Sequence, residues 1–298
     1  MSTPRFGRVL TAMVTPFASS GAVDYDVASR LAKFLVAEGS DGLVVAGSTG
    51  EGSSLSDEEK LDLFACVAEA VTVPVLAGST FANTQQSVVL TAQVKATGVA
   101  GVLATTPAYA RPSQAGISAH LGAIAESTPL EVMLYDVPSR TGRKIASATT
   151  IGLVKGHKNI SALKDASGDL VSAAHTKAVL GDALTLYSGD DLVLLPFLAI
   201  GAVGIVSVAS HWVGPEVAGI VHAAALGEWE EAQMLNERAA ASFAFESTET
   251  YPNPMPAKAV LRALGFNVGE CRLPHAPSDP ELNASAADLV ASLKTARG

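Results

Sequence analysis

Lys164 is the side chain whose type and position point most directly to covalent chemistry. It follows a short apolar run, residues 160–163, that predicts a buried strand, and the turn-forming Ser167 and Gly168 come next. A strand would hold the lysine stem rigidly and direct its amine into a cavity beyond the strand. Because burial disfavours the ammonium form, such an amine is a nucleophile suited to a Schiff base with a carbonyl substrate. The alternative is that Lys164 only extends towards solvent and pairs with Asp165.

A second group of candidate residues lies in the glycine-rich segment 47–52. Ser48 and Thr49 stand between glycines there, so backbone amides and hydroxyl groups can converge on an anion such as a carboxylate. The alternative is an ordinary tight turn between a strand and a helix. The segment is neither a dinucleotide-binding fingerprint nor a Walker loop, since no lysine follows its second glycine.

Two tyrosines and an arginine follow two other apolar runs. Tyr135 ends the run before that of Lys164, so a phenol and an amine are expected on one face, where the phenol can act as general acid or base. Arg140 lies on the next loop and offers two parallel hydrogen bonds to a substrate carboxylate. Tyr109 lies between two prolines and is expected at the mouth of the site or at an interface.

The elements that must position these side chains recur along the chain. Short apolar runs alternate with helical patterns, and there are eight of them: 9–14, 42–46, 73–77, 101–105, 131–135, 160–163, 184–187 and 202–207. Eight strand–helix units predict an α/β fold, a (β/α)8 TIM barrel, whose working residues stand at the carboxyl ends of the strands. A doubly wound open sheet is the alternative, but the even spacing of the units favours closure.

Several helix boundaries can be predicted within this repeat. Asp24, Thr84 and Ser113 are candidate N-caps, and Ser56 with Glu59 forms a capping box. After about residue 227 the strand pattern stops, and three helices are expected at 228–244, 256–264 and 279–296. We therefore expect a barrel over 1–227 that carries the active site, and a C-terminal helical extension over 228–298 packed on it.

Composition limits the partners and cofactors. The chain has 298 residues, 48% of them hydrophobic, and a net charge of −9 without any Lys/Arg cluster, which argues against nucleic acid and anionic membranes. No apolar run approaches transmembrane length and no signal core precedes residue 8, so a cytoplasmic location is expected. The scattered histidines and two cysteines have no metal-ligand spacing, so neither a catalytic metal nor another cofactor is expected.

Motifs along nearly the whole chain resemble the pyruvate-dependent class I lyase family of dihydrodipicolinate synthase and N-acetylneuraminate lyase. They are VTPF at 14–17, GSTGE at 47–51, TPAY at 106–109, YDVPSRTG at 135–142, ALKDASGD at 162–169, YSGDD at 187–191 and NPMPAK at 253–258. The arginine of the 135–142 run is typical of the dihydrodipicolinate synthase branch, where it meets the carboxylate of the aldehyde substrate. Sugar-acid members usually lack it.

The resemblance implies a reaction and a role for each candidate. Lys164 would form an imine with pyruvate, and the derived enamine would attack aspartate semialdehyde to give 4-hydroxy-tetrahydrodipicolinate. Tyr135 would exchange protons through Ser48 with Tyr109 of a neighbouring subunit in a homotetramer, a dimer of dimers. The remaining assignments are pyruvate binding by Thr49, aldehyde binding by Arg140, and pocket-lining main chain at Gly189 and Val206.

Departures from the family pattern and rival functions complete the expectations. Ser48 stands where the family usually has threonine, and serine has the freer rotamer, so the proton relay is expected to be held less firmly. Ala108 and Gln86 replace a tyrosine and an acidic residue of the lysine-binding pocket of lysine-inhibited members, which predicts weak or absent inhibition by lysine. The alternatives are an aldolase for N-acetylneuraminate or another 2-keto-3-deoxy sugar acid, and a non-catalytic barrel that binds a keto acid.

Overall fold

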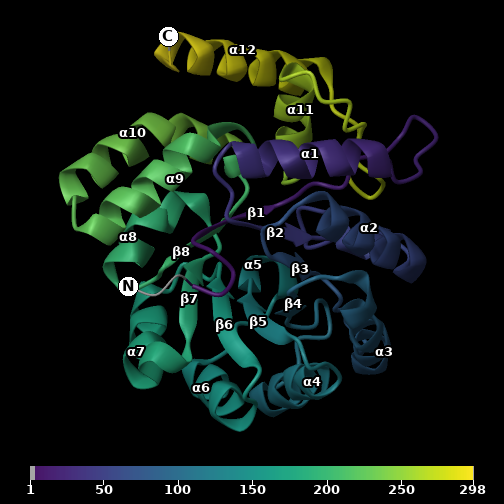
Figure 1. Cartoon of the computed structure of the whole chain (residues 1–298), viewed down its shortest axis with the longest axis vertical. Coiled ribbons are helices and arrows are strands. Elements are labelled where there is room, and N and C mark those ends of the chain that lie inside the picture. The colour runs from purple at the N-terminus through teal and green to yellow at the C-terminus, as the bar shows by residue number, and fades with distance from the viewer. Residues whose placement is uncertain (1–3, 298) are drawn as a thin grey trace.

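The computed structural model describes residues 4–297 and has at its centre a closed barrel of parallel strands (Figure 1). Each strand pairs with the next, and β8 pairs with β1, which closes the barrel. The predicted barrel is therefore confirmed, and the open sheet is excluded. The strands are β1 Val9–Ala12, β2 Gly42–Val45, β3 Val75–Ala77, β4 Gly101–Thr105, β5 Glu131–Asp136, β6 Ile160–Asp165, β7 Thr185–Ser188 and β8 Gly204–Ser207.

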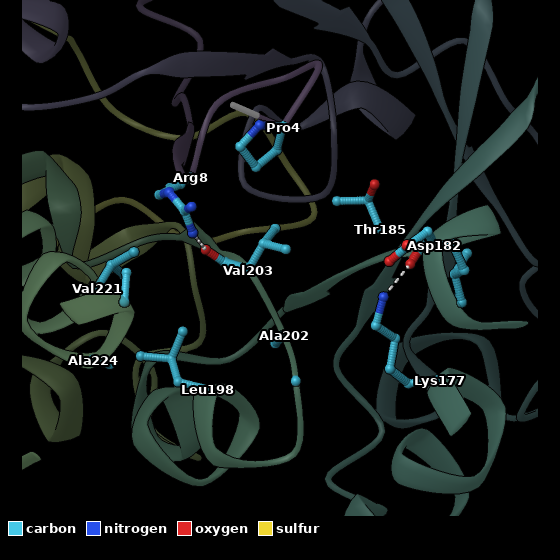
Figure 2. Close-up of a pocket in the computed structure, with 13 residues that line it drawn as sticks. Pro4, Arg8, Lys177, Asp182, Thr185, Leu198, Ala202, Val203, Val221 and Ala224 are labelled. Atoms are coloured by element: carbon cyan, nitrogen blue, oxygen red, sulfur yellow. Dashed lines mark hydrogen bonds between the residues drawn. The ribbon is translucent and has the colours of Figure 1, made fainter. Parts of the chain in front are cut away.

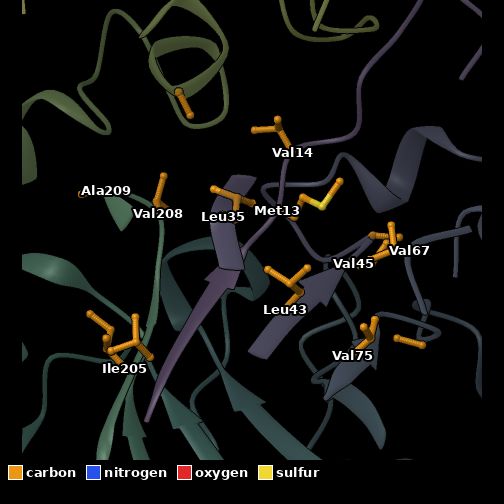
Figure 3. Close-up of a cluster of buried hydrophobic side chains, with 14 of the residues drawn as sticks. Met13, Val14, Leu35, Leu43, Val45, Val67, Val75, Ile205, Val208 and Ala209 are labelled. Carbon is orange, nitrogen blue, oxygen red and sulfur yellow. The ribbon is translucent and has the colours of Figure 1, made fainter. Parts of the chain in front are cut away.

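The strands are apolar because they are buried on both faces, as expected for a parallel sheet. Side chains that point inwards, such as Val44, Leu103 and Met133, form a cluster inside the barrel. Side chains that point outwards pack against the surrounding helices, and Figure 3 shows Leu43 and Val45 of β2 among them. The two clusters hold the strand ends, and hence the candidate site, on a rigid frame.

Helices cover the outside of the barrel between successive strands, except for the one-turn helix α5, which lies after β5 at the end of the barrel. They are α1 Tyr25–Ala37, α2 Asp57–Ala70, α3 Thr84–Val94, α4 Gln114–Glu126, α5 Pro138–Thr141, α6 Ser147–Gly156, α7 Leu170–Leu180, α8 Leu194–Ala199 and α9 Ser210–Leu226. Short 3-10 helices occur at Gly52–Ser54, Lys95–Thr97, Gly181–Ala183 and Asp191–Val193.

Most of the predicted helix starts are confirmed. Asp24 and Ser113 accept hydrogen bonds from the first-turn amides of α1 and α4, and the capping box of Ser56 and Glu59 is present at α2. The prediction that Thr84 caps α3 was wrong by one residue. Asn83 is the N-cap and accepts from the Gln86 amide, because an asparagine side chain caps at least as well as a threonine.

Strand ends differ more than helix ends from the prediction. β6 continues to Asp165, so Lys164 lies within the strand rather than just after it. β1 stops at Ala12, two residues earlier than predicted, and β8 begins at Gly204 rather than at residue 202. An apolar run continues into buried loops on either side of a strand, so hydrophobicity alone does not mark where the ladder stops.

Three further helices follow the barrel: α10 Trp229–Phe245, α11 Met255–Ala263 and α12 Pro280–Arg297. In Figure 1 α10 runs beside α9, and α11, drawn in yellow-green, stands between α1 and the yellow α12. Each starts within a residue of the predicted position. Among residues 4–297, no helix is both long enough and apolar enough to span a bilayer.

Candidate active site

Lys164 and Tyr135 stand side by side at the carboxyl ends of β6 and β5. Their Cα atoms are paired in the ladder, both side chains are about 4% exposed, and the Lys164 Nζ atom lies 4.3 Å from the centroid of the Tyr135 ring. No ion pair formed among residues 4–297 includes Lys164. Asp165 instead accepts a hydrogen bond from the Ser167 amide at 2.8 Å. The pairing with Asp165 that the sequence left open is therefore absent, and the amine is held next to a phenol.

Gly189 and Val206 border this pair on the following strands. A Cβ atom at Gly189 would lie 2.8 Å from Cβ of Ala166 and 3.0 Å from Cγ of Lys164, so a larger residue would displace the lysine stem. Val206 points into the barrel with 1% exposure. Gly189, directly after β7, therefore limits the space around the lysine stem, and Val206 of β8 belongs to the inner cluster that also contains Tyr135.

The glycine-rich segment folds as a tight turn directly after β2. The Gly52 amide donates to the Gly47 carbonyl at 3.0 Å and the Glu51 amide to the Ser48 carbonyl at 3.1 Å. Ser48 is half-buried and Thr49 is buried, with 2% exposure. The turn thus brings two hydroxyl groups to the carboxyl end of the barrel.

A buried ion pair fixes the end of this turn to the C-terminal helices. Glu51 has a left-handed backbone (φ 53°), and its Oε1 lies 2.6 Å from Nζ of Lys258 on α11, with both side chains fully buried. Its other oxygen, Oε2, accepts from the Arg272 amide at 2.7 Å. A carboxylate in this environment holds the turn strongly, because breaking a buried pair leaves an uncompensated charge.

A cavity of about 390 Å³ lies at this end of the barrel, and its lining includes neither Lys164 and Thr49 nor Gly189 and Val206. Its walls include Ser48, Tyr135 and Arg140, and also Thr106, whose Oγ1 is buried without a hydrogen-bond partner in the part of the chain that the structure describes. His275, from the segment between α11 and α12, lines it too. Its size and its few polar groups suit a small organic substrate.

Arg140 lies on α5, where its amide donates to the Val137 carbonyl at 2.9 Å. The side chain is exposed, and its NH2 group donates to the backbone carbonyl of Asn253 at 3.2 Å. The Asn253 side chain in turn donates from Nδ2 to Thr49 Oγ1 at 2.8 Å. Sequence reasoning placed the site on the barrel alone and so missed Asn253 and His275. The motif at 253–258 was the only signal that could have indicated the asparagine.

Tyr109 is not brought into this cavity. Its side chain is 97% exposed, its φ is +66°, and only the preceding Ala108 lines the cavity wall. A positive φ at a tyrosine is uncommon and is kept where the surroundings require it. Within one chain, the phenol projects into solvent.

Three carboxyl groups, those of Asp136, Asp190 and Glu246, have raised pKa values because they are buried. Burial raises the pKa of Asp136 to about 7, against the opposing effect of the Ile145 amide that it accepts from. Burial also raises the pKa of Asp190, and it raises that of Glu246 well above its ordinary value, with the charge of Asp191 adding to the effect. The Lys164 charge acts in the opposite direction on Asp190 and Glu246.

Another cavity, of about 530 Å³, lies at the amino ends of β7 and β8 (Figure 2). The cationic side chains at this cavity donate hydrogen bonds to backbone carbonyls. Lys177 donates to the carbonyls of Gly181 and Leu184 at 2.7 and 2.9 Å, and Arg8 donates to that of Val203 at 3.1 Å. These hydrogen bonds connect the ends of helices and strands, so they help to stabilise the amino face of the barrel.

No group of three or more His, Cys, Asp or Glu residues within residues 4–297 is arranged to hold a metal ion. The carboxyl face presents the amine, the phenol, the hydroxyl groups and the guanidinium described above. An amine beside a phenol is suited to imine formation with proton transfer.

Known proteins are similar to this chain over almost its whole length. The chain is 46% identical over 291 residues to 4-hydroxy-tetrahydrodipicolinate synthase 2 of Halalkalibacterium halodurans, covering 97% of this chain and 99% of that protein. It is 44% identical over 297 residues to the 4-hydroxy-tetrahydrodipicolinate synthase of a Synechococcus strain, covering 99% and 97%. The crystal structure of dihydrodipicolinate synthase from Cyanidioschyzon merolae with lysine bound matches with a TM-score of 0.92 at 41% identity, over 97% of this chain and 99% of the other.

A family model covers the same span. Residues 5–293 match the sequence model of the dihydrodipicolinate synthetase family. This range includes every strand and all of the candidate residues. The resemblance drawn from the motifs is thereby confirmed, and the chain belongs to the dihydrodipicolinate synthetase family.

Proposed function

We propose that this chain condenses pyruvate with L-aspartate 4-semialdehyde, through an imine on Lys164, to give 4-hydroxy-tetrahydrodipicolinate. Relatives at 40–46% identity over nearly the whole chain carry the name of that activity. The observation that carries the residue assignment is the buried Lys164 amine, 4.3 Å from the Tyr135 ring and without an ionic partner among the described residues. An amine that is not neutralised by a carboxylate can lose its proton and attack a ketone.

The steps follow from these groups. The Lys164 amine adds to the pyruvate ketone and water leaves, which gives the imine; loss of a methyl proton then gives the enamine. The enamine carbon attacks the aldehyde carbon, and a proton reaches the new alkoxide. The substrate amine next attacks the imine carbon, closes the ring and expels the Lys164 amine. Tyr135 is the group close enough to the amine to move these protons.

Binding of the two carboxylates falls to different residues. Thr49 and the amides of the 47–52 turn would hold the pyruvate carboxylate, and Arg140 would hold the carboxylate of the aldehyde. Ser48 would connect Tyr135 to Tyr109 of a neighbouring subunit in a homotetramer. The 97% exposure of Tyr109 supports this assignment, because a phenol that serves its own cavity would not project into solvent. The cytoplasmic location stays a prediction.

Arg140 argues against the rival function within the family. A fixed guanidinium next to the cavity suits a second substrate with a carboxylate at that end. A sugar acid presents hydroxyl groups there instead. A keto-acid-binding barrel without activity would have no need of a phenol beside the amine.

Borohydride trapping tests the proposal. Reduction in the presence of pyruvate should add one pyruvate-derived group to the peptide that contains Lys164. Lys60 is the other reactive candidate, since burial lowers its pKa to about 8 and its Nζ lies 3.8 Å from the Phe81 ring that lines the cavity. Peptide mapping with Lys60→Arg as the control separates the two. Labelling at Lys60, or no labelling, would refute the mechanism. A separate assay of turnover with aspartate semialdehyde tests the identity of the second substrate.

A further inference from the structure

Asn253 lies outside the barrel sequence yet contacts both proposed carboxylate sites. Its Nδ2 donates to Thr49 Oγ1 at 2.8 Å, and its backbone carbonyl accepts from Arg140 NH2 at 3.2 Å. It is the last residue before the Pro254 that precedes α11, and it is 6% exposed. A single residue of the C-terminal segment thus connects Thr49 on the β2 turn with Arg140 after β5.

The hydrogen bond to Thr49 decides which way the threonine hydroxyl donates. An amide NH2 group can only donate, so Thr49 Oγ1 accepts from it. The hydroxyl proton of Thr49 is therefore free to be donated elsewhere. A hydroxyl that is already accepting one bond is also a stronger donor in the next one, because linked hydrogen bonds polarise each other. This arrangement prepares Thr49 to donate to an anion.

The contact with Arg140 acts on the second site. The Arg140 side chain is long, has several rotatable bonds and is exposed. Without a contact in the protein, it would become ordered only when substrate binds, and that loss of entropy would weaken binding. A backbone carbonyl that accepts from one NH2 group fixes the fork beforehand and leaves its other N–H groups for a carboxylate.

Asn253 is itself held firmly by the α11 segment. Its amide donates to Ser247 Oγ at 3.3 Å, and the Met255 amide donates to the Pro252 carbonyl at 3.0 Å. Five residues further along, Lys258 forms the buried ion pair with Glu51 at the other end of the glycine-rich turn. The side-chain oxygen of Asn253 receives no hydrogen bond from residues 4–297, so the bond to Thr49 is what orients its amide.

We propose that Asn253 is a positioning residue for both sites: its side chain fixes the donor direction of the Thr49 hydroxyl, and its backbone carbonyl fixes the orientation of Arg140. The proposal rests on the assignment of these sites to the two carboxylates made above. Asn253 acts through Thr49 and Arg140 and touches neither substrate.

Steady-state kinetics of Asn253→Ala test the role of the side chain. The KM for pyruvate should rise about three- to tenfold, the loss typical of one hydrogen bond, while kcat changes less. The KM for aspartate semialdehyde should change little, because alanine keeps the backbone carbonyl that accepts from Arg140. In Asn253→Asp the carboxylate can only accept, so the Thr49 hydroxyl turns towards it and away from substrate. That variant should bind pyruvate more weakly than Asn253→Ala does. Pyruvate binding equal to the wild type in Asn253→Asp would overturn the donor-direction argument.

A double-mutant cycle shows whether the Asn253 side chain acts through Thr49. Once Thr49→Val has removed the hydroxyl, Asn253→Ala should no longer change the KM for pyruvate. In an Arg140→Ala background, where Thr49 is intact, Asn253→Ala should raise that KM as it does in the wild type. Effects of Asn253→Ala and Thr49→Val that simply multiply would refute the positioning role.

A matched control separates positioning from loosening of the segment. Thr248→Ala removes the hydroxyl that accepts from the Tyr251 amide at 2.9 Å in the same segment, but leaves the Asn253 side chain in place. If Thr248→Ala reproduces the rise in the KM for pyruvate, Asn253 has only a structural role. Borohydride labelling of Lys164 at saturating pyruvate should persist in every Asn253 variant. Its absence from the wild type would be a failure of the proposed function, whereas its loss in the Asn253 variants alone would overturn the positioning role.

Discussion

Replacement of Asp136 by asparagine should make the protein more stable at alkaline pH and leave it nearly unchanged at acid pH. Asp136 follows Tyr135 in β5, is 2% exposed and accepts a hydrogen bond from the Ile145 amide at 3.0 Å. Burial raises its pKa to about 7, from 3.8 in an unfolded chain. The folded state therefore prefers the neutral acid. The stability that this group supplies is complete below pH 3.8 and is lost as the pH rises through 7.

The magnitude follows from the size of the shift. About three pH units at 1.36 kcal/mol each correspond to roughly 4 kcal/mol of unfolding free energy lost between about pH 4 and pH 8. The asparagine of the variant would stay neutral throughout and could still accept from the Ile145 amide. The variant should thus match the wild type near pH 4 and exceed it by a few kcal/mol at about pH 8.

Urea unfolding at a fixed protein concentration, from about pH 4 to pH 8, measures this difference. Asp288→Asn, at an exposed position of α12, is the control and should leave the pH dependence unchanged. A constant difference between Asp136→Asn and wild type at every pH would refute the reasoning, since it would mean that the carboxyl group does not titrate in this range. Asp165, the neighbour paired with Asp136, also has a raised pKa, so part of the pH dependence should remain in the variant.

Three further results are expected. Arg140→Ala should weaken the binding of aspartate semialdehyde roughly ten- to a hundredfold and that of pyruvate much less, because a charge-assisted hydrogen bond of about 1.5–3 kcal/mol is lost. Equal losses for the two substrates in steady-state kinetics would contradict this. Mixing inactive Tyr109→Phe with inactive Lys164→Ala subunits should restore some activity, and no recovery despite demonstrated subunit exchange would exclude a shared site. Free lysine should inhibit weakly or not at all, since Ala108 and Gln86 offer neither an aromatic ring nor a carboxylate to bind it. Saturable inhibition in an activity titration at or below about 1 mM lysine, a binding free energy near −4 kcal/mol, would contradict this.

The repeat of the fold could be predicted because each element carries its own local signal. Apolar runs that are buried on both faces mark the strands, and Asp24, Ser56 and Ser113 mark helix starts by a chemistry that acts within three residues. Strand ends depend instead on pairing with a neighbour that is distant in sequence. Lys164 belongs to β6 because its Cα pairs with Tyr135 on one side and Tyr187 on the other, which a run of apolar letters does not reveal.

The candidate site divides in the same way. The convergence of Lys164, Tyr135, Ser48 and Arg140 could be predicted because a barrel brings strand ends together at one face, whereas their roles stay predictions. The position of Asn253 could not be predicted, because it depends on how a segment of the C-terminal extension packs back onto the β2 turn, more than 200 residues earlier in the chain. The contribution of His275 to the cavity wall has the same origin.

The C-terminal helices therefore supply more than a cover for the barrel. The turn after β2 carries two residues with left-handed backbones, Ala46 and Glu51, and such conformations persist only where the surroundings hold them. Lys258 provides that hold through an ion pair in which neither side chain reaches solvent. The burial that makes the pair costly to break also keeps water from competing for it, so the turn stays in one arrangement. Thr49 lies between these two strained residues and is fixed in addition by Asn253, which is why the geometry of the pyruvate site should depend on residues far outside the barrel sequence.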